Sequence, residues 1–284
     1  MRPRCNYIWF FLITLFYLTG FPEPGCGYVL QGSHLLDLMT VKTGKAERIQ
    51  VMQSLLIYDD NPLGDPIVIK ETVRYLFPDS FRSDTETAAA KRIHVVSGNT
   101  AVTVIDGRIT DELDSDLDRY KDIMLYRSRI SLGERLRSLG IDITITSLGR
   151  FQEKIAYVLG AQYPDASAPQ LWIDRETFRP IRWLIRHSTL PDVSKRLELR
   201  YYNWQRIQGV WYPLRVEFYE GEQLVREIRV EQVKINPPFA EGLFDLSYIR
   251  AMYQPAPAAA PESTDSEGIG DIQKTIDEFR KIFE

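Results

Sequence analysis

The feature that most constrains the fold is a two-residue alternation of apolar side chains near the end of the chain. In residues 211–219, the alternate positions that carry mostly apolar side chains are Tyr212, Leu214, Val216 and Phe218. In residues 180–187 the same pattern places Trp183 and Ile185 opposite Arg182 and Arg186. Because successive side chains of a strand point to opposite faces, both stretches predict a sheet with one apolar and one charged face.

Short turn-forming segments separate a series of such stretches. The predicted strands cover residues 151–160, 170–174, 180–187, 196–204, 210–219 and 223–235. Strands that follow one another through short links form an antiparallel meander. The apolar face of this meander needs a cover.

The N-terminal half of the chain predicts a helix and more strands. The first half of residues 32–53 has the spacing of an amphipathic helix capped by Ser33, and the second half changes towards a strand. Residues 66–85 predict a long strand that ends at Pro78. Residues 91–109 predict two strands joined by a Ser-Gly-Asn turn.

Residues 110–143 interrupt the strands. They predict an acidic loop, which we expect to be solvated, followed by one or two short helices with apolar side chains at helical spacing. In the helical part these are Ile130, Leu132, Leu136 and Leu139. Together with the N-terminal helix, this insert is the available cover for the apolar face, so the fold class is α+β, mostly β, with short helices over an antiparallel sheet.

Residues 1–27 predict a signal peptide. Arg2 and Arg4 precede an apolar run that is shorter than the ~17–25 residues of a spanning helix, and a small-x-small site ends at Gly27. An uncleaved signal anchor and a lipoprotein modified at Cys26 are the alternatives. Cleavage after Gly27 would remove both cysteines, so the exported domain would depend on its hydrophobic core for stability.

The C-terminal segment differs in composition from the domain of residues 28–250. Residues 251–268 predict a disordered linker rich in Pro and Ala, and residues 269–284 a short amphipathic helix. This helix either folds back on the domain or docks on a partner or a membrane surface.

Little in the chain predicts chemistry. The sequence carries none of the common hydrolase, nucleotide-binding or zinc-protease motifs, and its three histidines are far apart, so we expect no enzyme, no metal site and no cofactor. His94 lies between apolar strand residues and is expected to be structural. Carboxylates paired only in space remain an alternative. A formal net charge of −4 gives no general attraction for nucleic acid.

Several motifs resemble the LolA-like periplasmic lipoprotein carriers. These are "VRYLFPDSFRSD", with Pro78 and Phe81 in a Pro-x-x-Phe pattern, "VVSGNT", "LWIDRETFRPIRW" and "VKINPPFAEGLFDL". The resemblance covers roughly residues 32–248. The carriers commonly have a basic residue just before the Pro, whereas this chain has Phe77.

The resemblance implies a curved antiparallel sheet, an incomplete β-barrel, whose cavity takes acyl chains beneath short helices. The candidate cavity residues are Trp183, Ile185, Tyr212, Leu214, Val216 and Phe218, and the candidate lid residues are Leu132, Leu136 and Leu139. A filled core would use the same residues, so that alternative stays open.

The function that follows is an exported, non-enzymatic carrier or chaperone, monomeric and periplasmic, for the acyl chains of lipids or lipoproteins. Its expected partners are an acylated protein or lipid, with an inner-membrane transporter or an outer-membrane acceptor, and not nucleic acid. A protein-interaction or sensing module of the cell envelope on the same scaffold is the alternative.

Overall fold

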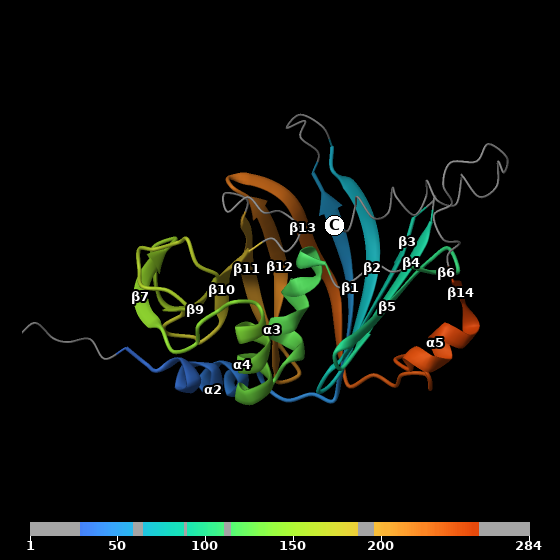
Figure 1. The fold of residues 1–284 in the computed structure, drawn as a ribbon, viewed down its shortest axis with the longest axis horizontal. Helices are drawn as coiled ribbons and strands as arrows, with labels where there is room; N and C mark the ends of the chain where they lie inside the picture. The colour runs from blue at the N-terminus through green and yellow to red at the C-terminus, as the bar shows by residue number, and fades with distance from the viewer. Residues whose placement is uncertain (1–28, 59–64, 88–89, 111–114, 187–195, 256–284) are drawn as a thin grey trace, which may run out of the picture.

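A computed structural model describes residues 29–58, 65–87, 90–110, 115–186 and 196–255 (Figure 1). Within these ranges fourteen strands form a single sheet, in the order β14-β6-β5-β4-β3-β2-β1-β13-β12-β11-β10-β9-β8-β7. Figure 1 shows this sheet curving around α2, α3 and α4. The predicted fold class, a curved antiparallel sheet covered by short helices, is confirmed.

The strands are short to moderate in length and follow one another closely. Their bounds are β1 Arg48–Ile57, β2 Ile67–Leu76, β3 Ser80–Glu86, β4 Lys91–Ser97, β5 Thr100–Ile105, β6 Arg108–Thr110, β7 Thr146–Phe151, β8 Lys154–Leu159, β9 Gln170–Asp174, β10 Pro180–Arg186, β11 Arg196–Ile207, β12 Val210–Glu220, β13 Gln223–Ile235 and β14 Gln254–Pro255. The described helices are α2 Gly32–Thr43, the 3-10 helix η1 Asp116–Lys121, α3 Asp122–Leu125, α4 Arg129–Ser138 and α5 Leu246–Met252.

Two local meanders, β1–β6 and β7–β13, meet along one seam. Strand β1 pairs antiparallel with β13, with Ile49 opposite Ile235, and a register shift lies between Met52 and Gln53. The short strand β14 pairs with β6 in parallel. Every other pairing in the described sheet joins strands that are neighbours in sequence.

The sequence located most strands, but it missed β7, and two of its predicted strands are each divided by a tight turn. Strands β9 to β13 lie within three residues of their predicted bounds. The predicted strand 66–85 is two strands, since a turn at residues 77–79 separates β2 from β3. The second strand of residues 91–109 is also divided, because Asp106 and Gly107 take positive φ angles of 47° and 75° and make a tight hairpin.

Helix α2 covers the sheet without the predicted cap. It begins one residue before Ser33, with Gln31 at the N-cap position and no side-chain hydrogen bond there. A Cβ on Gly32 would lie 2.0 Å from the backbone oxygen of Ile143, so the first turn of α2 approaches that backbone closer than any side chain allows. This contact fixes the N-terminal end of α2 against the segment that follows α4.

The described secondary structure continues slightly past residue 250. Residues 251 and 252 complete α5, and Gln254 and Pro255 form β14, within the segment predicted as the start of the linker. The predicted signal peptide of residues 1–27, the rest of the linker and the helix of residues 269–284 lie outside the described residues. None of the described helices is long and apolar enough to cross a membrane.

Candidate functional site

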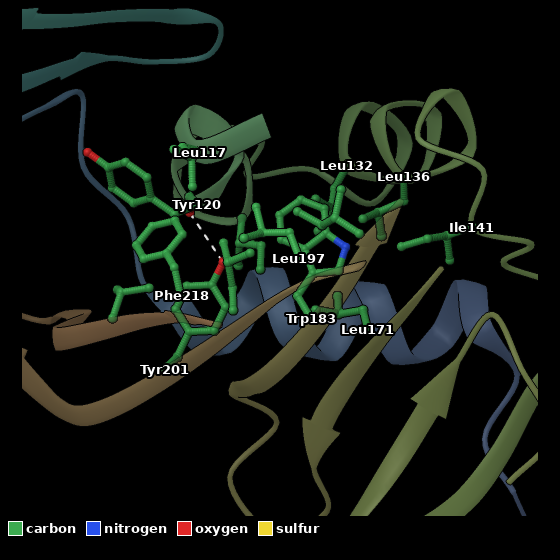
Figure 2. Close-up of a cluster of buried hydrophobic side chains, with 14 of the residues drawn as sticks. Leu117, Tyr120, Leu132, Leu136, Ile141, Leu171, Trp183, Leu197, Tyr201 and Phe218 are labelled. Carbon is green, nitrogen blue, oxygen red and sulfur yellow. Dashed lines mark hydrogen bonds between the residues drawn. The ribbon is translucent and has the colours of Figure 1, made fainter. Parts of the chain in front are cut away.

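An apolar layer fills the space between the sheet and the helices (Figure 2). Its sheet side is formed chiefly by β8 to β13, with one residue each from β1, β2 and β5, and its helical side by α2, η1, α3 and α4. Trp183 of β10 is fully buried in the layer, and Leu132 and Leu136 of α4 lie above it. The contacts of α4 with this layer are therefore made chiefly by leucine side chains.

One polar atom in this layer has no hydrogen-bond partner. The indole Nε1 of Trp183 is buried and pairs with no atom of the described residues. In contrast, Nε1 of Trp172, which is equally buried, donates to Oε1 of Gln170 at 2.9 Å. An unpaired buried N–H is costly, and in a native structure it calls for an explanation.

The structure brings most of the predicted cavity residues together. Trp183, Ile185, Val216 and Phe218 belong to the main apolar cluster, with at most 3% of any of these side chains exposed. These side chains pack closely beneath the helices. That they receive an acyl chain stays a prediction.

Two of the predicted cavity residues lie apart from that cluster. Tyr212 belongs to a second cluster, where its hydroxyl lies 3.2 Å from that of Tyr75. Leu214 is half-buried and belongs to none of the buried clusters. Opposite it in β11, Asn203 takes a positive φ of 54°, and no ladder pair joins the two residues, although the register is the same on either side.

The predicted lid residues divide in the same way. Leu132 and Leu136 are fully buried in the main cluster, whereas Leu139 is only partly buried against it. Ile130, at the start of α4, is 66% exposed. The helix therefore presents two leucines to the layer and leaves its first turn open to solvent.

A polar network occupies the other part of the interior, under η1. The buried carboxylate of Glu71 accepts hydrogen bonds from Nε2 of Gln53, at 2.5 Å, and from the hydroxyl of Ser83. Nε2 of Gln53 also contacts the hydroxyl of Tyr120 in η1, at 3.1 Å. Burial raises the pKa of Glu71, although both hydrogen bonds act in the opposite direction.

The acidic segment takes part in this polar interior, so the expectation of a solvated loop is wrong for Asp116 and Asp118. Both are buried, and Asp118 lies 3.4 Å from the guanidinium of the fully buried Arg92. Nearby, His94 is structural, as predicted: it is fully buried and its Nδ1 lies 2.8 Å from the hydroxyl of Thr103. A buried charge needs such a partner, and Arg92 provides one that allows Asp118 to lie in the interior.

The helical insert is thus attached in two different ways. Its first part, η1, is held by buried hydrogen bonds and ion pairs. Its last part, α4, rests on Leu132 and Leu136, and Nε of Arg135 donates to Asp122 of α3 at 2.6 Å. Moving α4 away from the sheet would expose apolar surface without breaking the polar network under η1.

A cavity of about 800 Å³ opens at one end of the helical cover. Its walls are the C-terminal half of α2, the link from α2 to β1, the turn between β2 and β3, and the first turn of α4. Phe77 and Pro78 contribute an apolar wall, and Arg127 lies across it with its guanidinium 3.9 Å from the centre of the Phe77 ring. This size is typical of small-molecule sites.

Sequence reasoning missed Arg127. The motif comparison noted only that Phe77 stands where the carriers commonly have a basic residue, and the structure supplies a guanidinium there from the link between α3 and α4. A local signal was present, since Arg127 directly precedes Ser128, which caps α4 by accepting from the N–H of Ser131. Nothing in the sequence indicated that this residue would meet Phe77.

Within the described residues, no group of three or more His, Cys, Asp and Glu side chains could hold a metal ion. The site is instead an apolar layer with one unpaired donor, closed by a helix, with a partly polar cavity at its end.

Comparisons with known proteins identify the fold. No family model matches the chain, and no curated protein matches it. The chain is similar to the structure of a LolA superfamily protein from Nitrosomonas europaea, with 13% identity and a TM-score of 0.53 over 77% of this chain and 99% of the other. A DUF1329 family protein from Desulfovibrio piger gives 11% identity and a TM-score of 0.50, over 77% and 98%. At such identities the likeness concerns the fold alone: the chain has a LolA-like fold.

Proposed function

We propose that the protein is an exported, non-enzymatic carrier or chaperone of the periplasm that holds acyl chains of lipids or lipoproteins between its sheet and α4. The observation that carries the proposal is the unpaired Nε1 of Trp183, in an apolar layer beneath a helix that rests on two leucines. In this proposal the protein takes its acylated ligand from an inner-membrane transporter or delivers it to an outer-membrane acceptor.

An acyl chain can replace the leucine side chains of α4 because both are apolar. When α4 moves, the space that Leu132 and Leu136 fill becomes available to methylene groups, which need the same dry surroundings. The two leucine side chains hold eight carbons, so the vacated space takes roughly eight methylenes, whose burial gains about 6 kcal/mol, whereas exposing the leucines costs about 3–6 kcal/mol. The exchange is therefore close to balanced. The N–H of Trp183 then donates to an ester or amide carbonyl, and so acquires the partner that it lacks.

Two measurements test the proposal. Solvent extraction of the purified protein, followed by mass spectrometry, is expected to release a lipid or an acyl chain. Separately, a brominated stearic acid is expected to quench the fluorescence of Trp183, because bromine quenches only at short range.

The control for quenching is a tryptophan on another face. Trp211 is half-buried and stacks under the guanidinium of Arg179, 3.3 Å from its ring centre. Trp183→Phe should remove most of the quenching, and Trp211→Phe should leave it. Equal quenching in both variants, together with an extract free of acyl compounds, would refute acyl carriage.

A further inference from the structure

The cavity beside α4 is lined by a partly buried cation, Arg127, that has no ion-pair partner among the described residues. Nε of Arg127 donates to the backbone oxygen of Met124 at 3.0 Å, and Nη1 makes a long contact of 3.4 Å with that of Gly44. Nη2 is buried without a hydrogen-bond partner, and within the described residues no carboxylate lies within ion-pair distance of the guanidinium. Such a charge is costly to bury unless something compensates it.

The remaining attraction comes from an aromatic face. The Phe77 ring beneath Arg127 contributes a cation–π contact, which is weaker than a buried ion pair. Burial lowers the pKa of Arg127 to about 10, so the side chain still carries its charge at neutral pH. The site therefore keeps a positive charge that the chain itself leaves largely uncompensated.

The other charged side chains of the cavity lining balance one another, so the excess positive charge is that of Arg127. Two other cations, Lys45 and Arg129, line the cavity and are exposed, against the two carboxylates Asp37 and Glu47. The lining thus has three positive and two negative side chains, in a chain whose net charge is −4. The N-terminus of α4 begins at the same wall and adds a partial positive charge.

Apolar side chains border this positive region. Val41 of α2 lines the cavity and is 71% exposed. Phe77 and Pro78 also line the cavity. A free inorganic anion would use only the cations, whereas an amphiphile would use both parts of this lining.

We propose that this cavity binds the anionic headgroup, a carboxylate or a phosphate ester, of a lipid whose chain lies against Val41 and Phe77. The inference rests on the proposed function, because it assigns the polar end of the same kind of amphiphile. Arg127 supplies the main contact, since a guanidinium binds both of these anions through paired N–H groups. Lys45 and Arg129 lie at the rim.

The test compares two probes that differ only in charge at the head. Oleate and oleyl alcohol share one hydrocarbon chain, and titration calorimetry on the full chain freed of bound lipid measures the affinity for each. Oleate is expected to bind about tenfold more tightly, as one charge-assisted hydrogen-bonded contact implies. Arg127→Gln should bring oleate to the level of the alcohol, and Arg127→Lys should restore part of the preference.

The matched control is Arg137→Gln, an equal change of charge on an exposed residue near the other end of α4. It should leave the preference for oleate intact. Lys45→Gln, which alters an exposed rim residue, should lower the affinity for oleate about two- to threefold and keeps the test valid if Arg127→Gln fails to fold.

The outcomes separate the two proposals. An unchanged preference for oleate in both Arg127→Gln and Lys45→Gln would overturn the headgroup site while leaving acyl carriage intact. Failure of both oleate and oleyl alcohol to bind the wild type would overturn the proposed function. Inorganic phosphate, tested alone, identifies the source of the anion. If phosphate binds through Arg127 and oleate shows no preference over the alcohol, the site belongs to a free anion and the lipid headgroup is refuted.

Discussion

Replacing Trp183 by Phe tests whether its N–H is unpaired. The change removes about three heavy atoms from a fully buried site, and a residual cavity of roughly 40 Å³ costs about 1 kcal/mol. It also removes a buried donor that has no partner, which returns about 1–3 kcal/mol of desolvation penalty. The free energy of unfolding should therefore stay unchanged or rise by up to about 2 kcal/mol.

Trp172→Phe is the matched comparison. Trp172 is also buried, but its N–H donates to Gln170, so the substitution leaves the buried Oε1 of Gln170 unpaired. With the same cavity cost, this variant should lose about 2–4 kcal/mol. Urea unfolding of the protein freed of bound lipid, followed by circular dichroism, measures both variants. Equal destabilisation by the two substitutions would show that Trp183 has a partner, and the argument from its unpaired N–H would fail.

Three further predictions follow from particular contacts. Burial raises the pKa of Glu71, so the folded state favours its protonated form. The contribution of Glu71 to the free energy of unfolding should be greatest below the ordinary pKa of 4.5 and should be lost as pH rises through the folded pKa. Glu71→Gln should remove this pH dependence from urea unfolding measured between pH 4 and 8. Gly32→Ala, which places a Cβ against the backbone of Ile143, should cost about 1–3 kcal/mol, whereas Ser33→Ala, with no cap to lose, should stay within about 0.5 kcal/mol. N-terminal sequencing of the exported protein should begin near Tyr28; an intact Met1 or a lipidated Cys26 would exclude cleavage after Gly27.

The sequence could predict the sheet because alternation is a local property. Trp183, Ile185, Val216 and Phe218 were assigned to one apolar face by spacing alone, and all four lie in the main cluster. Leu214 has the same spacing but lies outside it, and the opposing residue of β11, Asn203, is left-handed and makes no ladder pair with it. A two-residue alternation predicts which face of the sheet a side chain occupies, but it contains no information about irregularities in the neighbouring strand.

The site depended on contacts between distant segments, which leave no local pattern. Arg127 meets Phe77 across fifty residues of chain, and the pairing became visible only in the fold. The acidic segment illustrates the opposite error: a run of carboxylates is usually solvated, yet Asp118 turns inward because Arg92 lies in the interior. Whether such a carboxylate is solvated or buried depends on a partner that is remote in sequence.

The seam between β1 and β13 bears on how the chain folds. Along this seam, Glu47 and Asn236 are 189 residues apart and joined by a hydrogen bond, whereas the strands within each meander are close neighbours in sequence. Closing so long a loop carries a large entropy cost, so the meanders can assemble early and their union comes late. Until β13 has emerged, β1 has one unpaired edge that is open to other chains. A protein of this topology therefore needs to pair β13 with β1 before that edge pairs with another protein chain.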